Sequence, residues 1–156
     1  KVRAVVAGGS SRQESVEIGL GALSSDMKLV AVQDGARPFA DWQLIDRVVR
    51  AANTYGAAAP AIPVKDTIKV VKGGIVKETP ERAILKAVQT PQVFDFAILR
   101  GALKKARQDE LALTDDCSAV EHMGMSVKIV DGDEKNIKIT TPWDMKIAEL
   151  IMEESK

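Results

Sequence analysis

Asp34 stands where a phosphate-handling enzyme would place a metal ligand. It follows the apolar run KLVAVQ and precedes Gly35, so its carboxylate is expected at the rim of a sheet, where α/β proteins bind ligands. Mg²⁺ is commonly held in proteins by one carboxylate together with phosphate oxygens. An aspartate before a glycine is also a frequent turn former, and position alone does not choose between the two interpretations.

Lys138 and Arg37 are basic residues that could face the same rim. Alternation along residues 136–140 predicts a strand whose polar side chains, Lys138 among them, share one face. A lysine that leaves a buried sheet needs a charged partner, and a bound anion or a neighbouring carboxylate would serve. Arg37, beside Pro38, could likewise pair with a phosphate or with a carboxylate, because a guanidinium group forms paired hydrogen bonds to either.

Other polar clusters carry weaker signals. Gly8–Arg12, at a helix start, could bind an anion through free N–H groups, but it lacks the lysine of a Walker loop and also fits a capped turn. Asp115 and Asp116 at another helix start favour pairing with the helix dipole over catalysis. The single Cys117 and single His122 exclude an internal disulfide and a zinc site built from cysteine and histidine. The residues alone indicate an α/β enzyme that handles a phosphorylated ligand.

Predicted strands and helices alternate along most of the chain. Apolar runs predict strands over residues 1–7, 28–33, 57–64, 126–130 and 136–140. Helices are predicted to begin at Ser11, Asp41, Thr114 and Pro142, with a further helix around residues 99–106. Such alternation is typical of parallel crossovers, so we predict one doubly wound, Rossmann-like α/β domain with a mostly parallel sheet.

A hairpin interrupts this alternation. Residues 67–71 and 75–78 alternate around Lys72-Gly73-Gly74, a pattern typical of two strands joined by a tight turn. A two-stranded hairpin by itself is marginally stable in water. We therefore expect residues 65–87 to form an arm that packs on another surface. A second subunit is the natural candidate, which predicts a homodimer.

The composition is that of an ordinary globular domain. The chain has 156 residues, and 22 basic residues balance 22 acidic ones, so neither nucleic acid nor a membrane surface is indicated as a partner. No apolar run reaches the roughly 18 residues of a membrane span, and no signal-peptide pattern is present. One cysteine fits a reducing compartment, and we expect a cytoplasmic protein. Because the chain begins at Lys1 inside a predicted strand, we expect residues 1–156 to be an N-terminally incomplete domain.

Six segments of the sequence resemble one enzyme family, and they occur in the same order. They are Gly8–Val16, Val32–Pro38, Pro63–Lys69, Arg82 with Gln89–Phe94, Thr114–Glu121 and Asn136–Thr140. Together they are similar to the 2-C-methyl-D-erythritol 4-phosphate cytidylyltransferases over essentially the whole chain. The resemblance implies a nucleotidyltransferase fold. It also implies that CTP and methylerythritol phosphate react, with Mg²⁺, to give the CDP-sugar alcohol and pyrophosphate in isoprenoid precursor synthesis.

The resemblance also implies a role for individual residues. Gly9, Ser15 and Gly35 would lie at the nucleotide, with Gly9 and Ser15 at its cytidine end. Asp34 would hold the metal beside the α-phosphate, and Lys138 would neutralise charge on the phosphates. The residues implied for the methylerythritol phosphate pocket are Arg37, Thr67, Arg82, Thr90, Thr114 and Lys138. The implied catalytic set is Asp34, Lys138 and Arg82.

Two of these residues, Thr67 and Arg82, lie in the predicted arm. The family resemblance implies that the arm crosses to the partner, so both residues would serve the active site of the neighbouring subunit. Family members also carry an N-terminal glycine-rich loop with an arginine, followed by a lysine, around the triphosphate. Residues 1–156 contain no such loop, so we expect them to be inactive by themselves.

Two alternatives remain open at this stage. Arg37-Pro38 and Gln89–Gln92 also occur in ribitol-5-phosphate cytidylyltransferases, whereas Asp66–Lys69 and Asn136–Lys138 favour the methylerythritol enzymes. The other alternative is a non-catalytic, truncated domain that binds a sugar phosphate or only dimerises.

Overall fold

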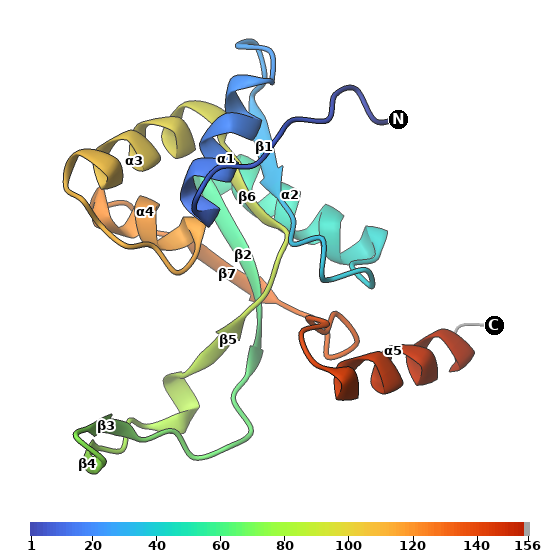
Figure 1. The fold of residues 1–156 in the computed structure, drawn as a ribbon, viewed down its shortest axis with the longest axis vertical. Coiled ribbons are helices and arrows are strands. Elements are labelled where there is room, and N and C mark those ends of the chain that lie inside the picture. The colour runs from blue at the N-terminus through green and yellow to red at the C-terminus, as the bar shows by residue number, and fades with distance from the viewer. Residues whose placement is uncertain (155–156) are drawn as a thin grey trace.

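The computed structural model describes residues 1–154, which form one mixed sheet with helices on both faces and a separate hairpin (Figure 1). The elements in chain order are α1 (Arg12–Gly21), β1 (Leu29–Val32), α2 (Trp42–Tyr55), β2 (Ala57–Pro63), β3 (Val70–Lys72), β4 (Ile75–Glu78), the 3₁₀ helix η1 (Arg82–Ile84), β5 (Lys86–Val88), β6 (Gln92–Asp95), α3 (Phe96–Gln108), α4 (Asp116–His122), β7 (Lys128–Asp131) and α5 (Pro142–Glu154). The predicted α/β class is confirmed. Within residues 1–154, no helix has the length and apolar character needed to cross a membrane.

The sheet is mostly antiparallel, so the predicted mostly parallel arrangement is wrong. Its strand order is β1-β6-β2-β5, and β7 also pairs with β2. The predicted strands β1, β2 and β7 do run in one direction, and β2 and β7 are parallel neighbours. However, β6 lies between β1 and β2 and runs against both, and β5 runs against β2. The chain returns from β2 to β5 through the arm and not through a crossover helix, and direct returns of this kind join antiparallel strands.

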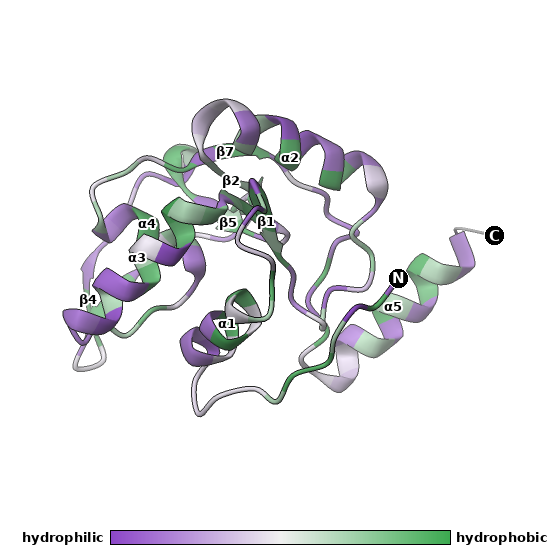
Figure 2. Cartoon of the chain, turned by 90° about the horizontal axis from the view of Figure 1, so that it is seen from above, coloured by the Kyte–Doolittle hydropathy of each residue, from purple (hydrophilic) through white to green (hydrophobic). Residues whose placement is uncertain are grey.

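Alternating side chains of the central strands serve two separate cores. Ala57, Ala59 and Phe94 pack with α1, α3 and α4, whereas Ala58 and Val93 pack with α2. This is the period-two alternation expected of a sheet that is covered on both faces. Figure 2 shows α2 on one side of the sheet and α3 and α4 on the other.

The sequence of α2 accounts for both of its ends and its buried face. Asp41 caps the helix, because its side chain accepts a hydrogen bond from the Leu44 N–H. Leu44, Val48 and Ala52 recur at helical spacing and are buried. Gly56 ends the helix with φ at 82°, in the left-handed region that favours glycine. All of these signals are local, and the predicted helix is confirmed.

Two predicted strands do not form in residues 1–154. Lys1–Ala7 has no regular structure, and Val2 and Val5 are 82% and 92% exposed. A strand needs a neighbour to bond its N–H and C=O groups, and no strand in the described chain pairs with this segment. Residues 136–140 are irregular as well. They meet the loop after β1 through the Ile139 N–H, which donates to the Ala36 carbonyl at 2.8 Å.

The predicted hairpin is confirmed. β3 and β4 pair across Gly73 and Gly74, whose φ angles of 60° and 75° are those of a two-residue primed turn. The hairpin forms a sheet of its own, which projects from the body of the molecule (Figure 1). Every residue of β3 and β4 is exposed, including Val71 at 54% and Ile75 at 64%. The arm therefore has no core of its own within this chain.

Candidate functional site

One small pocket gathers side chains from distant parts of the chain. It has a volume of about 150 Å³ and lies where the starts of α1 and α4 meet the loops after β1, β5 and β7. The lining residues are Arg12, Asp34, Arg37, Val88, Gln89, Thr90, Gln92, Thr114, Asp115 and Lys138. The pocket therefore brings together five of the residues predicted for the site, which are Asp34, Arg37, Thr90, Thr114 and Lys138.

Asp34 is the charged centre of this pocket. Its carboxylate lies 2.9 Å from the Lys138 Nζ and 3.7 Å from the Arg37 Nε, and its side chain is 17% exposed. Both basic residues therefore have a neighbouring carboxylate as their charged partner. Burial lowers the pKa of Arg37, and the charge of Asp34 opposes that shift. The pocket lining carries three basic side chains, those of Arg12, Arg37 and Lys138, which are groups that bind phosphate.

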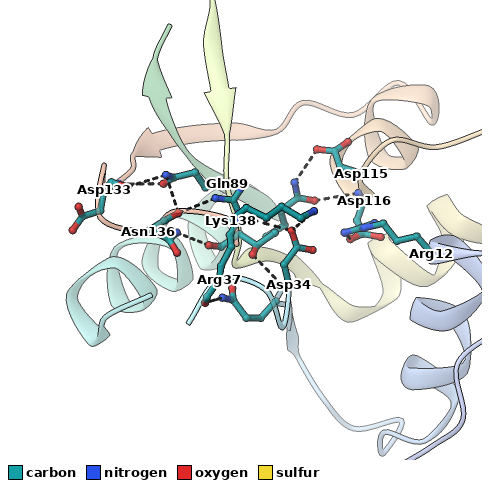
Figure 3. A network of polar contacts seen from close by, with 12 residues as sticks. Arg12, Asp34, Arg37, Gln89, Asp115, Asp116, Asp133, Asn136 and Lys138 are labelled. Atoms are coloured by element: carbon teal, nitrogen blue, oxygen red, sulfur yellow. Dashed lines mark hydrogen bonds and ion pairs between the residues drawn. The ribbon is translucent and has the colours of Figure 1, made fainter. Parts of the chain in front are cut away.

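Hydrogen bonds between buried polar groups place the loops that carry these charges. The Asp34 N–H donates to the Thr90 Oγ1 at 3.0 Å, and the fully buried Asn136 donates from Nδ2 to the Thr90 carbonyl at 2.8 Å. The Asn136 carbonyl accepts from the Arg37 Nη1 at 2.8 Å. Figure 3 shows these contacts around Asp34 and Lys138. Because buried polar groups need partners, this network replaces the predicted strand and still brings Lys138 to Asp34.

The start of α4 forms another wall of the pocket. Asp115 is the cap of this helix, since its Oδ1 accepts from the Ser118 N–H at 3.0 Å, so the predicted cap at Thr114 is wrong by one residue. Asp115 also accepts from the Gln92 Nε2 at 2.8 Å. Burial pushes the pKa of Asp115 upward, but the bonds from Ser118 and Gln92 outweigh it and leave the pKa lowered. Thr114 lines the pocket beside this cap.

A larger pocket of about 460 Å³ adjoins the first between α1 and β1. Arg12 and Asp34 line both pockets, and Ser15 and Gly35 line the larger one. Gly9 lies next to it, with its N–H donating to the Ser15 Oγ at 3.0 Å. A Cβ at Gly9 would come within 2.3 Å of the Glu14 side chain, so a larger residue at this position would displace Glu14. The three residues predicted to lie at the nucleotide, Gly9, Ser15 and Gly35, therefore lie in or beside one pocket.

The two predicted arm residues do not join the pockets of their own chain. Thr67 is exposed and lines neither pocket. Arg82 is exposed in η1, where its Nη1 donates to the Lys65 carbonyl at 2.9 Å. Within a single chain, both residues therefore stand apart from Asp34.

Sequence reasoning missed three polar residues that build the site. Gln89 is buried and donates from Nε2 to the Asp133 carbonyl at 2.8 Å. Gln92 of β6 is buried as well, and its Oε1 accepts from the Cys117 N–H in the first turn of α4. Arg12 lines both pockets. The sequence did contain a signal for the glutamines. Gln89 and Gln92 lie on either side of Thr90-Pro91 in an otherwise apolar stretch, and amides that become buried need specific partners. Arg12 ends the segment Gly8–Arg12 that was considered for anion binding through backbone N–H groups, but nothing local indicated its side chain, whose partner Asp116 lies far along the chain.

Asp34 could be one ligand of a metal ion whose other ligands are phosphate oxygens and water. Among residues 1–154, there is no cluster of three or more histidine, cysteine, aspartate or glutamate side chains that could hold a metal ion. Mg²⁺ often takes only one or two carboxylates when phosphate oxygens and water supply its other ligands. The carboxylate of Asp34, in a small pocket that is also lined by Arg12, Arg37 and Lys138, fits that arrangement.

Comparison with known proteins finds relatives along the whole chain. The family model of IspD, 2-C-methyl-D-erythritol 4-phosphate cytidylyltransferase, matches residues 1–154. The protein of that name from Desulforamulus reducens is 48% identical over 153 residues, covering 97% of this chain and 65% of the relative. Its counterpart from Pelotomaculum thermopropionicum is 50% identical over 153 residues, covering 97% and 64%. The crystal structure of the Thermus thermophilus protein gives a TM-score of 0.86 at 40% identity, covering 95% of this chain and 72% of that one.

The chain thus spans about two thirds of the length of the curated relatives it matches. The matched region includes the arm and both pockets, and the likeness holds for sequence and fold alike. On this evidence, the chain belongs to the 2-C-methyl-D-erythritol 4-phosphate cytidylyltransferase family.

Proposed function

We propose that the complete gene product containing this chain transfers the cytidylyl group of CTP to 2-C-methyl-D-erythritol 4-phosphate. A phosphate oxygen of the sugar alcohol attacks the α-phosphorus of CTP in line. The bond from that phosphorus to the bridging oxygen breaks, and pyrophosphate leaves with the bonding electrons. The products are 4-diphosphocytidyl-2-C-methyl-D-erythritol and pyrophosphate. The names of the relatives support methylerythritol phosphate over ribitol phosphate as the acceptor.

The observation that carries this proposal is the cluster of Asp34, Arg37 and Lys138. Two basic groups lie 2.9 and 3.7 Å from one carboxylate in a pocket of about 150 Å³. Phosphoryl transfer of this kind needs positioning and charge neutralisation, and it needs no protein nucleophile. We assign Lys138 to neutralising charge on the reacting phosphates. The 46% exposure of its side chain leaves the ammonium accessible to a ligand.

The two adjoining pockets divide the substrates between them. We assign the larger pocket, with Ser15 and Gly35 in its lining and Gly9 beside it, to CTP. We assign the smaller pocket to the sugar phosphate, with Arg37, Thr90 and Thr114 in its lining. Because Asp34 lines both pockets, it would lie beside the α-phosphate of CTP, where the sugar phosphate attacks.

Asp34 is also the residue that would hold Mg²⁺. When bound there, the cation would neutralise negative charge on the phosphate oxygens. The protein's own part is to keep the carboxylate in place, through the Asp34 N–H bond to Thr90 and the ion pair with Lys138.

The second part of the proposal is a homodimer in which the arm completes the partner's smaller pocket. The arm exposes apolar side chains, including Val76 at 52% and Ile84 at 75%, and a surface of this kind favours association. It also carries Thr67 and Arg82, which have no place in the pocket of their own chain. A two-fold contact would bring both residues to the neighbour in a symmetric way.

Pyrophosphate release by the complete gene product tests the proposed reaction. The assay supplies CTP and Mg²⁺ with methylerythritol 4-phosphate in one arm and ribitol 5-phosphate in the other. We expect release with methylerythritol 4-phosphate and at most slow release with ribitol 5-phosphate. Release with ribitol 5-phosphate alone would reassign the substrate, and binding of a sugar phosphate without any release would support a non-catalytic domain.

A further inference from the structure

An ion pair joins α1 to α4 where the two pockets meet. The Arg12 Nη2 lies 2.7 Å from the Asp116 Oδ2, although the residues are 104 positions apart. Arg12 lines both pockets and is 34% exposed, whereas the Asp116 side chain is 1% exposed. Figure 3 shows Arg12 reaching from α1 toward the start of α4. The pair therefore connects the helix that carries Ser15 with the helix start that follows Thr114.

The attachment of α1 to the body does not depend on this pair. Leu20 belongs to the core that α3 and α4 share. Glu17 pairs with Arg107 of α3 at 3.1 Å, and the Gln13 side chain donates to the Leu103 carbonyl at 3.4 Å. None of these residues lines the smaller pocket. Loss of the Arg12–Asp116 pair should therefore leave α1 docked but free to shift at its N-terminal end.

Asp116 is held in an arrangement that packing alone would not favour. Within residues 1–154, its buried Oδ1 has no hydrogen-bond partner, and burial raises the pKa of Asp116 because the carboxylate loses water. Burial also pulls the pKa of Arg12 down, but the hydrogen bond and the charge of Asp116 outweigh it and leave that pKa raised. A buried ion pair is weak evidence for stabilisation, because apolar residues would often serve the fold as well. Its position between two substrate pockets points to a role in function.

We propose that Arg12, oriented by Asp116, is a positioning residue that couples the two pockets, so that nucleotide in the larger pocket strengthens sugar phosphate binding in the smaller one. This inference rests on the proposed function. The pair holds the Ser15 side of α1 at a set distance from the Thr114–Asp115 wall. A ligand that orders the wall of one pocket thereby orders the wall of the other. Nucleotide must therefore raise the affinity for sugar phosphate by the same factor by which sugar phosphate raises the affinity for nucleotide.

Calorimetric titration of the complete gene product tests the coupling. Methylerythritol 4-phosphate is titrated with and without α,β-methylene CTP, an analogue whose carbon bridge blocks transfer. The wild-type protein should bind the sugar phosphate more tightly with the analogue, by a factor within the usual range of about 5–150. Arg12→Met should bring this factor close to one. Asp116→Asn, which keeps Arg12 but removes its anchor, should reduce it as well.

Three further variants separate positioning from stability. Arg107→Met removes the other ion pair of α1, outside both substrate pockets, and should leave the coupling unchanged. Arg12→Lys keeps the charge without the planar fork and should recover part of the coupling. The double variant Arg12→Met/Asp116→Leu replaces the buried ion pair by apolar side chains. It should regain the melting temperature lost in Arg12→Met without regaining the coupling.

The outcomes distinguish this inference from the proposed function. If Arg12→Met binds both ligands with wild-type coupling, or if the wild-type protein shows none, the inference fails and the proposed function stands. Recovery of the coupling in the double variant would also overturn it, because the pair would then act only through folding. A wild-type protein that binds neither ligand removes the proposed function and this inference together.

Discussion

Lys138 illustrates how a charge can be placed at a site by a loop. Its ammonium reaches Asp34 at 2.9 Å, although the segment that carries it is not a strand. The loop is held by the buried Asn136 and by the Ile139 N–H, which bonds to the loop after β1. The electrostatics of the site therefore depend on polar contacts between loops, and the core contributes only indirectly.

The first prediction concerns Lys138→Met in the complete gene product. Turnover should fall by about 10²–10³-fold, because a group that neutralises the transition state is removed. The free energy of unfolding should change by less than about 1 kcal/mol, because an ion pair at a half-exposed lysine contributes little. Steady-state kinetics and urea unfolding measure the two effects.

Lys135→Met is the matched control for this change. Lys135 pairs with Glu154 at 3.0 Å, with both side chains more than half exposed and outside the pockets. Its loss should leave turnover unchanged. Equal losses of turnover in the two variants would contradict the role assigned to Lys138.

At the scale of elements, the start of α4 combines a structural and a functional task. Asp115 caps the helix while Thr114, one residue earlier, remains in the pocket lining. The second prediction is that Asp115→Ala lowers the free energy of unfolding by about 0.5–2 kcal/mol, the usual cost of losing a cap. Thr114→Ala should cost less, because it removes no cap. Urea unfolding of both variants is the measurement, and the reverse order would restore Thr114 as the cap.

The start of α5 offers a pH test at the same scale. Asp144 accepts hydrogen bonds from the N–H and hydroxyl groups of Thr140 and Thr141, which lowers the pKa of its carboxyl from 3.8 to about 2. Because the folded pKa lies below the unfolded one, the ionised carboxylate stabilises the fold above the unfolded pKa. That contribution is lost as the pH falls toward 2.

The third prediction follows from this carboxylate. NMR titration of the Asp144 side chain should give a pKa near 2. Replacement of Thr140 and Thr141 by valine should raise that pKa only part of the way toward 3.8, because the backbone N–H bonds, which lower it most, remain. A midpoint for Asp144 near 3.8 in the unaltered protein would show that the bonds at the start of α5 do not persist in solution.

At the scale of the whole molecule, the arm projects away from the body and exposes its apolar side chains (Figure 1). The fourth prediction is that two inactive variants rescue each other. If Arg82 serves the neighbour's pocket while Lys138 acts in its own, a mixed dimer of Arg82→Ala and Lys138→Met contains one intact site. Random mixing makes about half of the dimers mixed, so activity should approach roughly a quarter of wild type, given two-fold symmetry.

The measurement is the specific activity of the complete gene product after the two variants are unfolded and refolded together. Native mass spectrometry confirms that mixed dimers form. Activity that stays at the level of the separate variants, while mixed dimers are present, would place Arg82 outside the partner's site. Refolding each variant alone is the control.

Much of the local structure could be predicted because its signals lie within a few residues. Asp41 and Gly56 mark the ends of α2, and Gly73-Gly74 marks the hairpin turn, since capping and turn geometry depend on neighbours in the chain. Asp34 was expected at the rim of the sheet because it follows an apolar strand, and β1 ends two residues before it. The order of six short motifs also indicated the family that the comparisons confirm.

Strand direction, strand pairing and polar partners were decided by contacts between distant segments. β6 inserts between β1 and β2 and makes the sheet mostly antiparallel, and nothing in the alternation of residues encodes that insertion. Residues 136–140 alternate like a strand, yet hydrogen bonds to the Thr90 and Ala36 carbonyls fix them as a loop. Arg12 meets Asp116 across 104 residues. Local sequence sets the conformation of short segments, whereas the partner of a buried polar group or a strand edge exists only once the chain has folded.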